Sequence, residues 1–345
     1  MNFIFLHRLI LLVGLIVLLT MVECGPGKRQ EIKAERGIEY MDYCKSCLFF
    51  TPKVGLMGGK RGDCACLWKT IDGGRNWRQK WLPGYMISDL TERDGVVYAT
   101  VYQWRRDMSS STYSVYTSCD QGESWEWKCN MKTEESLVDV LVVDNKRMFM
   151  VLDSGLLETR NGGRNWQTLW GGGWQMLRDN GQKTSMDDNY LYYSVYRVSP
   201  DNVPIHYIVR RSLESDKEES LRLPAGDRVE AICGNIAILR EKPFMTYRIE
   251  EDMSLTFLGL LKQSAFSVEY ISRCGEQLFV NMQTSSLGFK NFYSPDGGRH
   301  WKYVNKSESS VPISILSDSK HVWTFVIENH NSLLSYRYKR IWADK

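Results

Sequence analysis

Nine cysteines supply the first candidate chemistry in this chain of 345 residues. Four of them form two close pairs, Cys44 with Cys47 and Cys64 with Cys66, and these spacings would suit a tetrahedral zinc site. The same four thiols would form disulfides in an oxidising compartment, where cysteines of exported proteins are commonly paired. We favour disulfides over zinc, and we expect no metal and no cofactor.

Acidic or amide side chains recur in an eight-residue pattern, Ser/Thr-x-Asp/Asn-x-Gly-x-x-Trp, which occurs four times. Each residue type suits a tight turn between two strands, because Asp or Asn accepts backbone hydrogen bonds and Gly tolerates a positive φ. The Trp then begins the next strand and covers its own hairpin, burying about 150–250 Å². The pattern therefore predicts structural turns, and not catalytic carboxylates. The four copies are Thr70, Asp72, Gly74 and Trp77; Ser118, Asp120, Gly122 and Trp125; Thr159, Asn161, Gly163 and Trp166; and Ser294, Asp296, Gly298 and Trp301.

The spacing of the copies predicts the fold. Their tryptophans are separated by 48, 41 and 135 residues, and the last gap equals three intervals of 45. A period of this size is typical of a β-propeller. Alternating and β-branched runs then predict a single all-β propeller over residues 37–345, with seven blades favoured over six because six would need about 53 residues each. The copies fall in blades 1, 2, 3 and 6 of the predicted series 42–82, 85–129, 136–170, 174–223, 228–260, 267–304 and 311–342. Residues 37–41 are expected to complete the last blade and so to cover its exposed edge, unless residues 340–342 supply its outer strand.

The repeated pattern resembles the Asp-box, or BNR repeat, of sialidases, sortilin-type receptors and certain large glycanases. The surroundings of the first copy, from Cys47 to Gly59 and from Leu67 to Trp77, look like the repeat unit of the photosystem II stability and assembly factor-like propellers. Gly55 and Leu56 stand where that family has Gly-Trp, so the likeness is to the repeat and not to one member. The resemblance implies a propeller fold and, more weakly, a role in binding or assembly.

Glycoside hydrolysis is the enzymatic alternative that this resemblance raises. Sialidases hold their substrate with three arginines and use a Tyr activated by a Glu together with an Asp acid/base. One arginine usually belongs to an Arg-Ile-Pro-type motif in the first blade, but here Cys47 to Pro52 contains no arginine. Glu39 with Tyr40 and Glu269 with Tyr270 are adjacent pairs, which chance explains among 18 tyrosines and 41 acidic residues. An inverting hydrolase would need only two carboxylates from any two blades, and no spacing nominates them.

The other cysteines add two candidate disulfides. Without Cys24 the count is even, which is compatible with four bridges. Cys233 and Cys274 each precede a glycine after a similar segment one blade apart, so a bridge would tie equivalent turns of neighbouring blades. Cys119 and Cys129 flank the second copy of the repeat and would close its hairpin.

The N-terminus predicts export. His7 and Arg8 precede an apolar run from Leu9 to Val22, as in a secretory signal peptide. Residues 1–24 are therefore expected to be a cleaved signal, with a lipid-modified Cys24 or an uncleaved anchor as alternatives, and residues 25–36 a flexible leader. Each alternative places the propeller outside the cytosol, secreted, periplasmic or at the cell surface, with a membrane tether in two of the three.

Charge limits the partners. With 44 basic and 41 acidic residues the formal net charge is +3, which gives no electrostatic footprint for nucleic acid. We therefore expect an exported, monomeric, non-catalytic propeller that binds a protein or glycan partner on one face. A sialidase-like or other glycoside hydrolase is the alternative.

Overall fold

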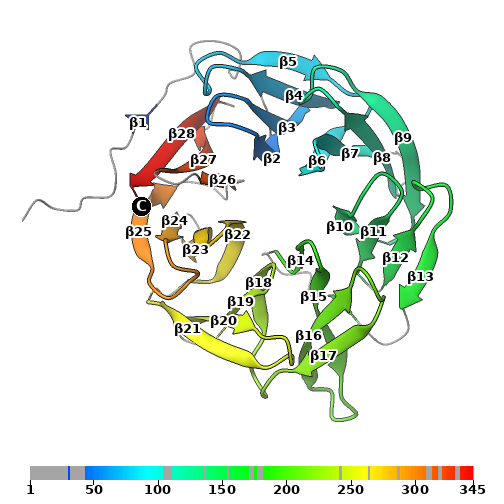
Figure 1. The fold of residues 1–345 in the computed structure, drawn as a ribbon, viewed down its shortest axis with the longest axis vertical. Coiled ribbons are helices and arrows are strands. Elements are labelled where there is room, and N and C mark those ends of the chain that lie inside the picture. Colours follow the sequence, from blue (N-terminus) through cyan, green and yellow to red (C-terminus); the bar gives the residue numbers. More distant parts are fainter. Residues whose placement is uncertain are drawn as a thin grey trace, which may run out of the picture.

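The computed structural model describes residues 30–31, 43–103, 111–135, 137–153, 155–170, 175–176, 182–240, 243–262, 265–285, 288–307, 313–317, 321–330 and 335–344. The described strands form seven four-stranded antiparallel sheets. The sheets follow one another around a central axis, so the chain folds as a single β-propeller (Figure 1). No helix in the described ranges is long and apolar enough to span a membrane.

Each sheet is one blade, and in the first six blades the strands run in chain order from the centre of the ring to the outside (Figure 1). Blade 1 comprises β2 (Tyr43–Phe49), β3 (Gly55–Arg61), β4 (Cys64–Thr70) and β5 (Arg78–Trp81). Blade 2 comprises β6 (Met86–Arg93), β7 (Val96–Gln103), β8 (Ser111–Ser118) and β9 (Glu126–Thr133). Blade 3 comprises β10 (Leu137–Val142), β11 (Met148–Leu152), β12 (Leu156–Thr159) and β13 (Gln167–Trp170).

The next three blades repeat this order. Blade 4 comprises β14 (Thr184–Met186), β15 (Tyr190–Val198), β16 (Pro204–Ser212) and β17 (Glu218–Arg222). Blade 5 comprises β18 (Val229–Cys233), β19 (Ile236–Leu239), β20 (Phe244–Ile249) and β21 (Leu255–Leu261). Blade 6 comprises β22 (Ser267–Cys274), β23 (Gln277–Ser285), β24 (Gly288–Ser294) and β25 (Lys302–Ser307).

The last blade closes the ring with both ends of the chain. β26 (Ile313–Ser317), β27 (His321–His330) and β28 (Ser335–Asp344) are followed by β1 (Gln30–Glu31), which pairs with Arg340 and Lys339. The outer strand therefore comes from the segment expected to be a flexible leader, and residues 37–41 lie outside the described ranges. Pairing the two ends covers an edge that would otherwise expose backbone donors and acceptors.

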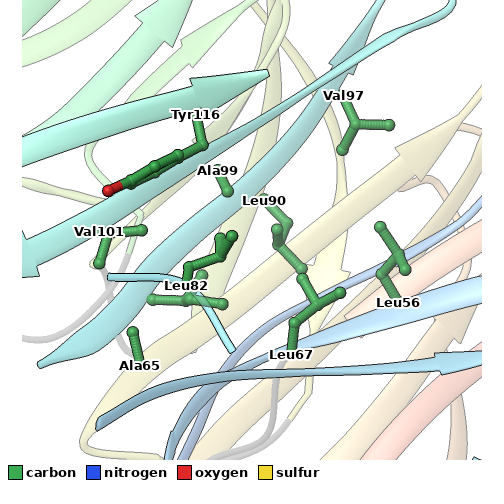
Figure 2. Packing of buried hydrophobic residues seen from close by; sticks show 10 residues of the cluster. Leu56, Ala65, Leu67, Leu82, Leu90, Val97, Ala99, Val101 and Tyr116 are labelled. Atoms are coloured by element: carbon green, nitrogen blue, oxygen red, sulfur yellow. The ribbon is translucent and has the colours of Figure 1, made fainter. Parts of the chain in front are cut away.

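Apolar cores lie between neighbouring blades. The second strand of a blade is covered on both faces, and all five residues of β11 are buried. Between blades 1 and 2, Leu56 and Leu67 pack with Leu90, Val97 and Ala99 (Figure 2). Because each blade buries its faces against its neighbours, the ring depends on contacts between blades as much as on those within them.

Antiparallel order gives the ring two different ends. The turns between the first and second strands and between the third and fourth strands share one end, which we call the box face because it carries the repeated pattern. The remaining connections, including those that lead to the next blade, share the other end, which we call the crossover face.

Candidate functional site

The four copies of the pattern, called boxes below, form the same hydrogen-bonded turn between the third and fourth strands. The Ser or Thr hydroxyl accepts a hydrogen bond from the amide of the glycine four residues on, at 2.8 Å for Gly74, 2.7 Å for Gly122, 2.9 Å for Gly163 and 2.8 Å for Gly298. The Asp or Asn side chain accepts a second bond from the amide of the residue before the Trp, at 3.0, 2.9, 3.0 and 2.9 Å in chain order.

These bonds also set the charge of the box carboxylates. Burial acts to raise the pKa of Asp72, but hydrogen bonds from Asn76 and Thr70 outweigh it, so the pKa lies below its usual value. Asp296 follows the same rule, with His300 as its main donor. Hydrogen bonds from Ser124 lower the pKa of Asp120. A carboxylate held in this way stays ionised and is occupied by its own turn, which makes it a poor general acid.

Each box from blade 2 onward also contacts the blade before it. A Cβ built on Gly122 would lie 2.9 Å from Leu56 of blade 1, and one on Gly163 would overlap Sγ of Cys129 in blade 2. The corresponding atom on Gly298 would lie 2.5 Å from Thr246 of blade 5. The glycines are therefore required by close packing between blades as well as by their positive φ.

The box tryptophans contribute to the same joints. The indole N–H groups of Trp77 and Trp125 donate to carbonyls of their own turns, those of Gly74 and Gly122, as a hairpin cover would. Trp301 instead donates to Oγ1 of Thr246 in the preceding blade, at 3.1 Å. Trp125, Trp166 and Trp301 all pack against clusters shared by two blades. The expectation of a cover over a single hairpin was thus too narrow.

A second polar group lies on the innermost strands, around the central axis. The hydroxyl of Ser46 in β2 donates to Oδ1 of Asp89 in β6 at 3.2 Å and accepts from the amide of Leu90 at 3.1 Å. The hydroxyl of Thr184 in β14 donates to Oδ2 of Asp139 in β10 at 2.5 Å. We call Ser46, Asp89, Asp139 and Thr184 the inner-strand belt, since its bonds join blades 1 to 2 and 3 to 4.

Matching irregularities position the belt. The strand register shifts between Cys44 and Ser46, between Ile87 and Asp89, and between Leu137 and Asp139. Each shift inserts one residue and re-aims the side chain that follows it. A belt residue therefore stands at the same point of three successive inner strands.

The belt carboxyl groups differ electrostatically from those of the boxes. Burial raises the pKa of Asp89 to about 7, and repulsion from Asp139 acts in the same direction. Burial also raises the pKa of Asp139, while hydrogen bonds from Thr184 and the amide of Val140 oppose the rise. Two neighbouring carboxyl groups with raised pKa values are the kind of pair in which one is protonated and the other ionised near neutral pH.

Sequence reasoning missed Asp89 and Asp139. A signal was available in the first strands of blades 2 and 3. When these strands are aligned, Asp89 and Asp139 take the same position, two residues after an apolar residue and directly before Leu90 and Val140. Glu269 was considered as a partner of the adjacent Tyr270, and its carboxylate accepts a hydrogen bond from Ser267 of its own strand. Glu39 and Tyr40 lie outside the described residues.

The cysteines are not joined as expected. None of the eight cysteines in the described ranges forms a disulfide, and no three His, Cys, Asp or Glu side chains there come together as metal ligands. Cys44 lies on β2 and Cys66 lies on β4. Strand β3 runs between them, and its residue Gly59 pairs with both cysteines. Burial raises the pKa of the Cys44 thiol to about 12, so this thiol stays protonated.

The other two proposed pairs form no bridge either. Cys129 packs against Gly163 of the following blade, whereas Cys119 is exposed in the second box. Cys233 and Cys274 do end equivalent strands, and the glycines that follow them have φ values of 56° and 59°. They are equivalent turn positions of neighbouring blades without a bridge between them.

No protein-family model and no curated protein matches the chain in sequence. Solved structures match it in fold. A protein from Lactobacillus plantarum aligns over 81% of this chain and 88% of its own, with 11% identity and a TM-score of 0.51. The α-L-arabinofuranosidase Arb93A of Fusarium graminearum aligns over 91% and 98%, with 12% identity and a TM-score of 0.46. An α-L-arabinanase of Penicillium chrysogenum aligns over 90% and 97%, with 10% identity and a TM-score of 0.46. At these identities the likeness extends to the propeller fold alone.

Proposed function

We propose that this chain is an exported, non-catalytic β-propeller that binds a protein or glycan partner on one of its faces. The observation that carries the proposal is the use made of its acidic side chains. The box carboxylates close turns, and Asp89 and Asp139 each accept a hydrogen bond from the inner strand of a neighbouring blade. Acidic residues that hold the framework together favour a rigid binding scaffold over a hydrolase.

A glycoside hydrolase is the second candidate, and one observation favours it. Asp89 and Asp139 lie on adjacent inner strands with raised pKa values. Glycosidases pair a protonated carboxylic acid with an ionised carboxylate, and such a pair requires this kind of pKa tuning.

One experiment separates the two candidates. The protein is titrated with a panel of oligosaccharides that includes arabinan fragments and sialosides, and each mixture is then analysed by chromatography after long incubation. We expect any bound saccharide to be recovered intact. Shorter products formed by the native protein, and lost in both Asp89→Asn and Asp139→Asn, would replace the scaffold with a hydrolase. Equal product from all three proteins would indicate a contaminating activity and leave the scaffold standing.

A further inference from the structure

A groove opens on the box face between blades 2 and 3. It has a volume of about 750 Å³, within the range of pockets that hold small ligands. One wall is the outer strand β9, and the other is the third box together with the turn between β10 and β11. The groove is thus remote in the fold from the inner-strand belt.

The groove is lined by basic side chains. Lys128, Lys146, Arg160 and Arg164 contribute to it, and no acidic residue does. Arg160 is neutralised by Glu158 and Asp216, with contacts of 2.9 and 2.7 Å.

The three remaining cations are not neutralised by a carboxylate of the described residues. Among the described residues no ion pair forms at Lys128, Lys146 or Arg164. The nearby carboxylate of Asp144 is directed to backbone amides, including that of Lys146 at 2.6 Å. The groove therefore carries uncompensated positive charge.

The equivalent joint between blades 1 and 2 shows that this charge is a particular feature of the groove. There Lys80 occupies the position of Lys128, three residues after the box Trp, and Glu123 occupies the position of Arg164. Glu123 contacts Lys80 at 2.8 Å and Lys69 at 2.7 Å, so both lysines there have a carboxylate partner. The third box has Arg164 in place of that glutamate. The arginine adds a positive charge beside Lys128, whereas the glutamate of the second box places a negative charge beside Lys80.

Aromatic and amide groups indicate the kind of anion. Trp127 of β9 lines the groove with 59% of its surface exposed, and its indole N–H donates to Asn130 at 3.0 Å, which orients the ring. Asn145 and Asn161 also line the groove. An exposed aromatic face with amides and cations suits a sugar ring that carries a carboxylate or sulfate.

We infer that the groove between blades 2 and 3 binds an acidic saccharide chain, with Trp127 against a sugar ring and Lys128, Lys146 and Arg164 around its anionic groups. The inference rests on the proposed binding function and gives it a ligand class and a site. The groove offers one exposed aromatic ring, Trp127, and the chain has a low net charge, which together fit a saccharide better than a nucleic acid.

The test is calorimetric titration of the whole protein with an oligogalacturonide, a heparin-derived oligosaccharide, a neutral oligosaccharide of equal length and a single-stranded DNA. We expect the acidic saccharides to bind, more weakly as salt rises, and the neutral one not to bind. Arg164→Glu places a carboxylate where Glu123 stands in the joint of blades 1 and 2, and it should lower the affinity by about tenfold or more, equivalent to about 1.4 kcal/mol. Trp127→Ala should lower it by a similar factor.

Two matched variants control for charge and for the loss of an exposed ring. Lys132→Glu makes the same charge change on β9 outside the groove, and Trp81→Ala removes a ring from the outer strand of blade 1 that is 52% exposed. Both should leave the affinity within about twofold, well below the tenfold step that marks a lost contact.

Three results would overturn the groove as an acidic-saccharide site. These are equal binding of the neutral saccharide, acidic binding that survives both groove changes, and DNA binding that alone responds to them. Acidic binding that survives both changes leaves the scaffold proposal intact, whereas cleavage of the bound saccharide refutes the scaffold and not the groove.

Discussion

Blades 2, 3 and 6 carry a box and blades 4 and 5 do not, yet both kinds are fixed to the preceding blade at the turn between their third and fourth strands. In a boxed blade this joint is apolar and tightly packed, as where Gly163 meets Cys129 and where Trp301 lies against blade 5. In a boxless blade an arginine of the preceding blade holds the turn. The comparison shows that the joint is the constant requirement and the box is one way to meet it.

The arginine joints are formed mainly with main-chain carbonyls. Arg210 of blade 4 donates to the carbonyls of Glu250 and Glu251 in blade 5, at 3.0 and 2.6 Å. Arg147 of blade 3 donates to the carbonyl of Leu213 in blade 4 and also contacts Asp216 at 2.5 Å. Because carbonyls are offered by any sequence, such joints leave no repeated side-chain pattern.

The largest expected effect comes from the box tryptophans. Trp77→Ala or Trp301→Ala should lower the free energy of unfolding by about 3–5 kcal/mol, since a large ring that is buried at Trp77 and partly buried at Trp301 is lost and a cavity remains. Denaturant unfolding measures this change. The exposed Trp81→Ala is the control and should cost less than about 0.5 kcal/mol. Equal stability of the native and Trp301→Ala proteins would show that the box Trp does not stabilise the joint.

A boxless joint should be nearly as sensitive at its arginine. Arg147→Met should lower the free energy of unfolding by about 3 kcal/mol, because Glu158, whose side chain is 3% exposed, loses a contact of 2.6 Å. Arg160 also contacts Glu158, but its side chain is 53% exposed. Arg160→Met should therefore cost clearly less in the same unfolding measurement. The reverse order would mean that the joint depends on the outer arginine.

The role of glycine in a boxed joint can be separated from its conformational role. Gly163→Ala should cost about 2–3 kcal/mol, from the strain of a positive φ together with the clash against Cys129. Gly95 has a φ of 78°, and a methyl group added to it would meet nothing within 4 Å, so Gly95→Ala carries the strain alone. Equal losses of stability in the two variants would show that blade contact adds nothing.

A pH series compares the belt with the boxes. The pKa of Asp89 is raised in the folded chain from 3.8 to about 7, so its contribution to stability is complete below 3.8 and is lost as the pH rises through about 7. Asp89→Asn removes the group that titrates. As the pH rises from 3.8 to about 7, the variant should therefore become more stable relative to the native chain. Thermal melts at several pH values test this, and parallel curves for the two proteins would contradict the raised pKa.

The smallest effect is expected within the second box, where Gln121 adopts a φ of 56°. The first, third and fourth boxes have glycine at this position, and there its amide donates to a carbonyl of the neighbouring turn at 2.8 Å. Gln121→Gly should raise the free energy of unfolding by about 0.5–1 kcal/mol by relieving the left-handed strain. A loss of stability would show that the glutamine side chain outweighs the strain.

The sequence was sufficient for the propeller fold and for the local role of the boxes, because Asp, Gly and Trp act within eight neighbouring residues. It was insufficient for the joints, since the partners of Gly163 and Trp301 belong to another blade. Asp89 and Asp139 were overlooked because a single Asp in a strand has no local signature. The outer strand at Gln30–Glu31 pairs with β28, almost a full chain length away, and nothing in its own residues predicts that pairing.

A box joins two blades. Amide hydrogen exchange of Trp301→Ala, compared with the native protein, tests it directly. Protection should fall in β20 of blade 5, which carries Thr246, as well as in β24 and β25 of blade 6. Loss of protection confined to blade 6 would limit the box to a role within its own hairpin.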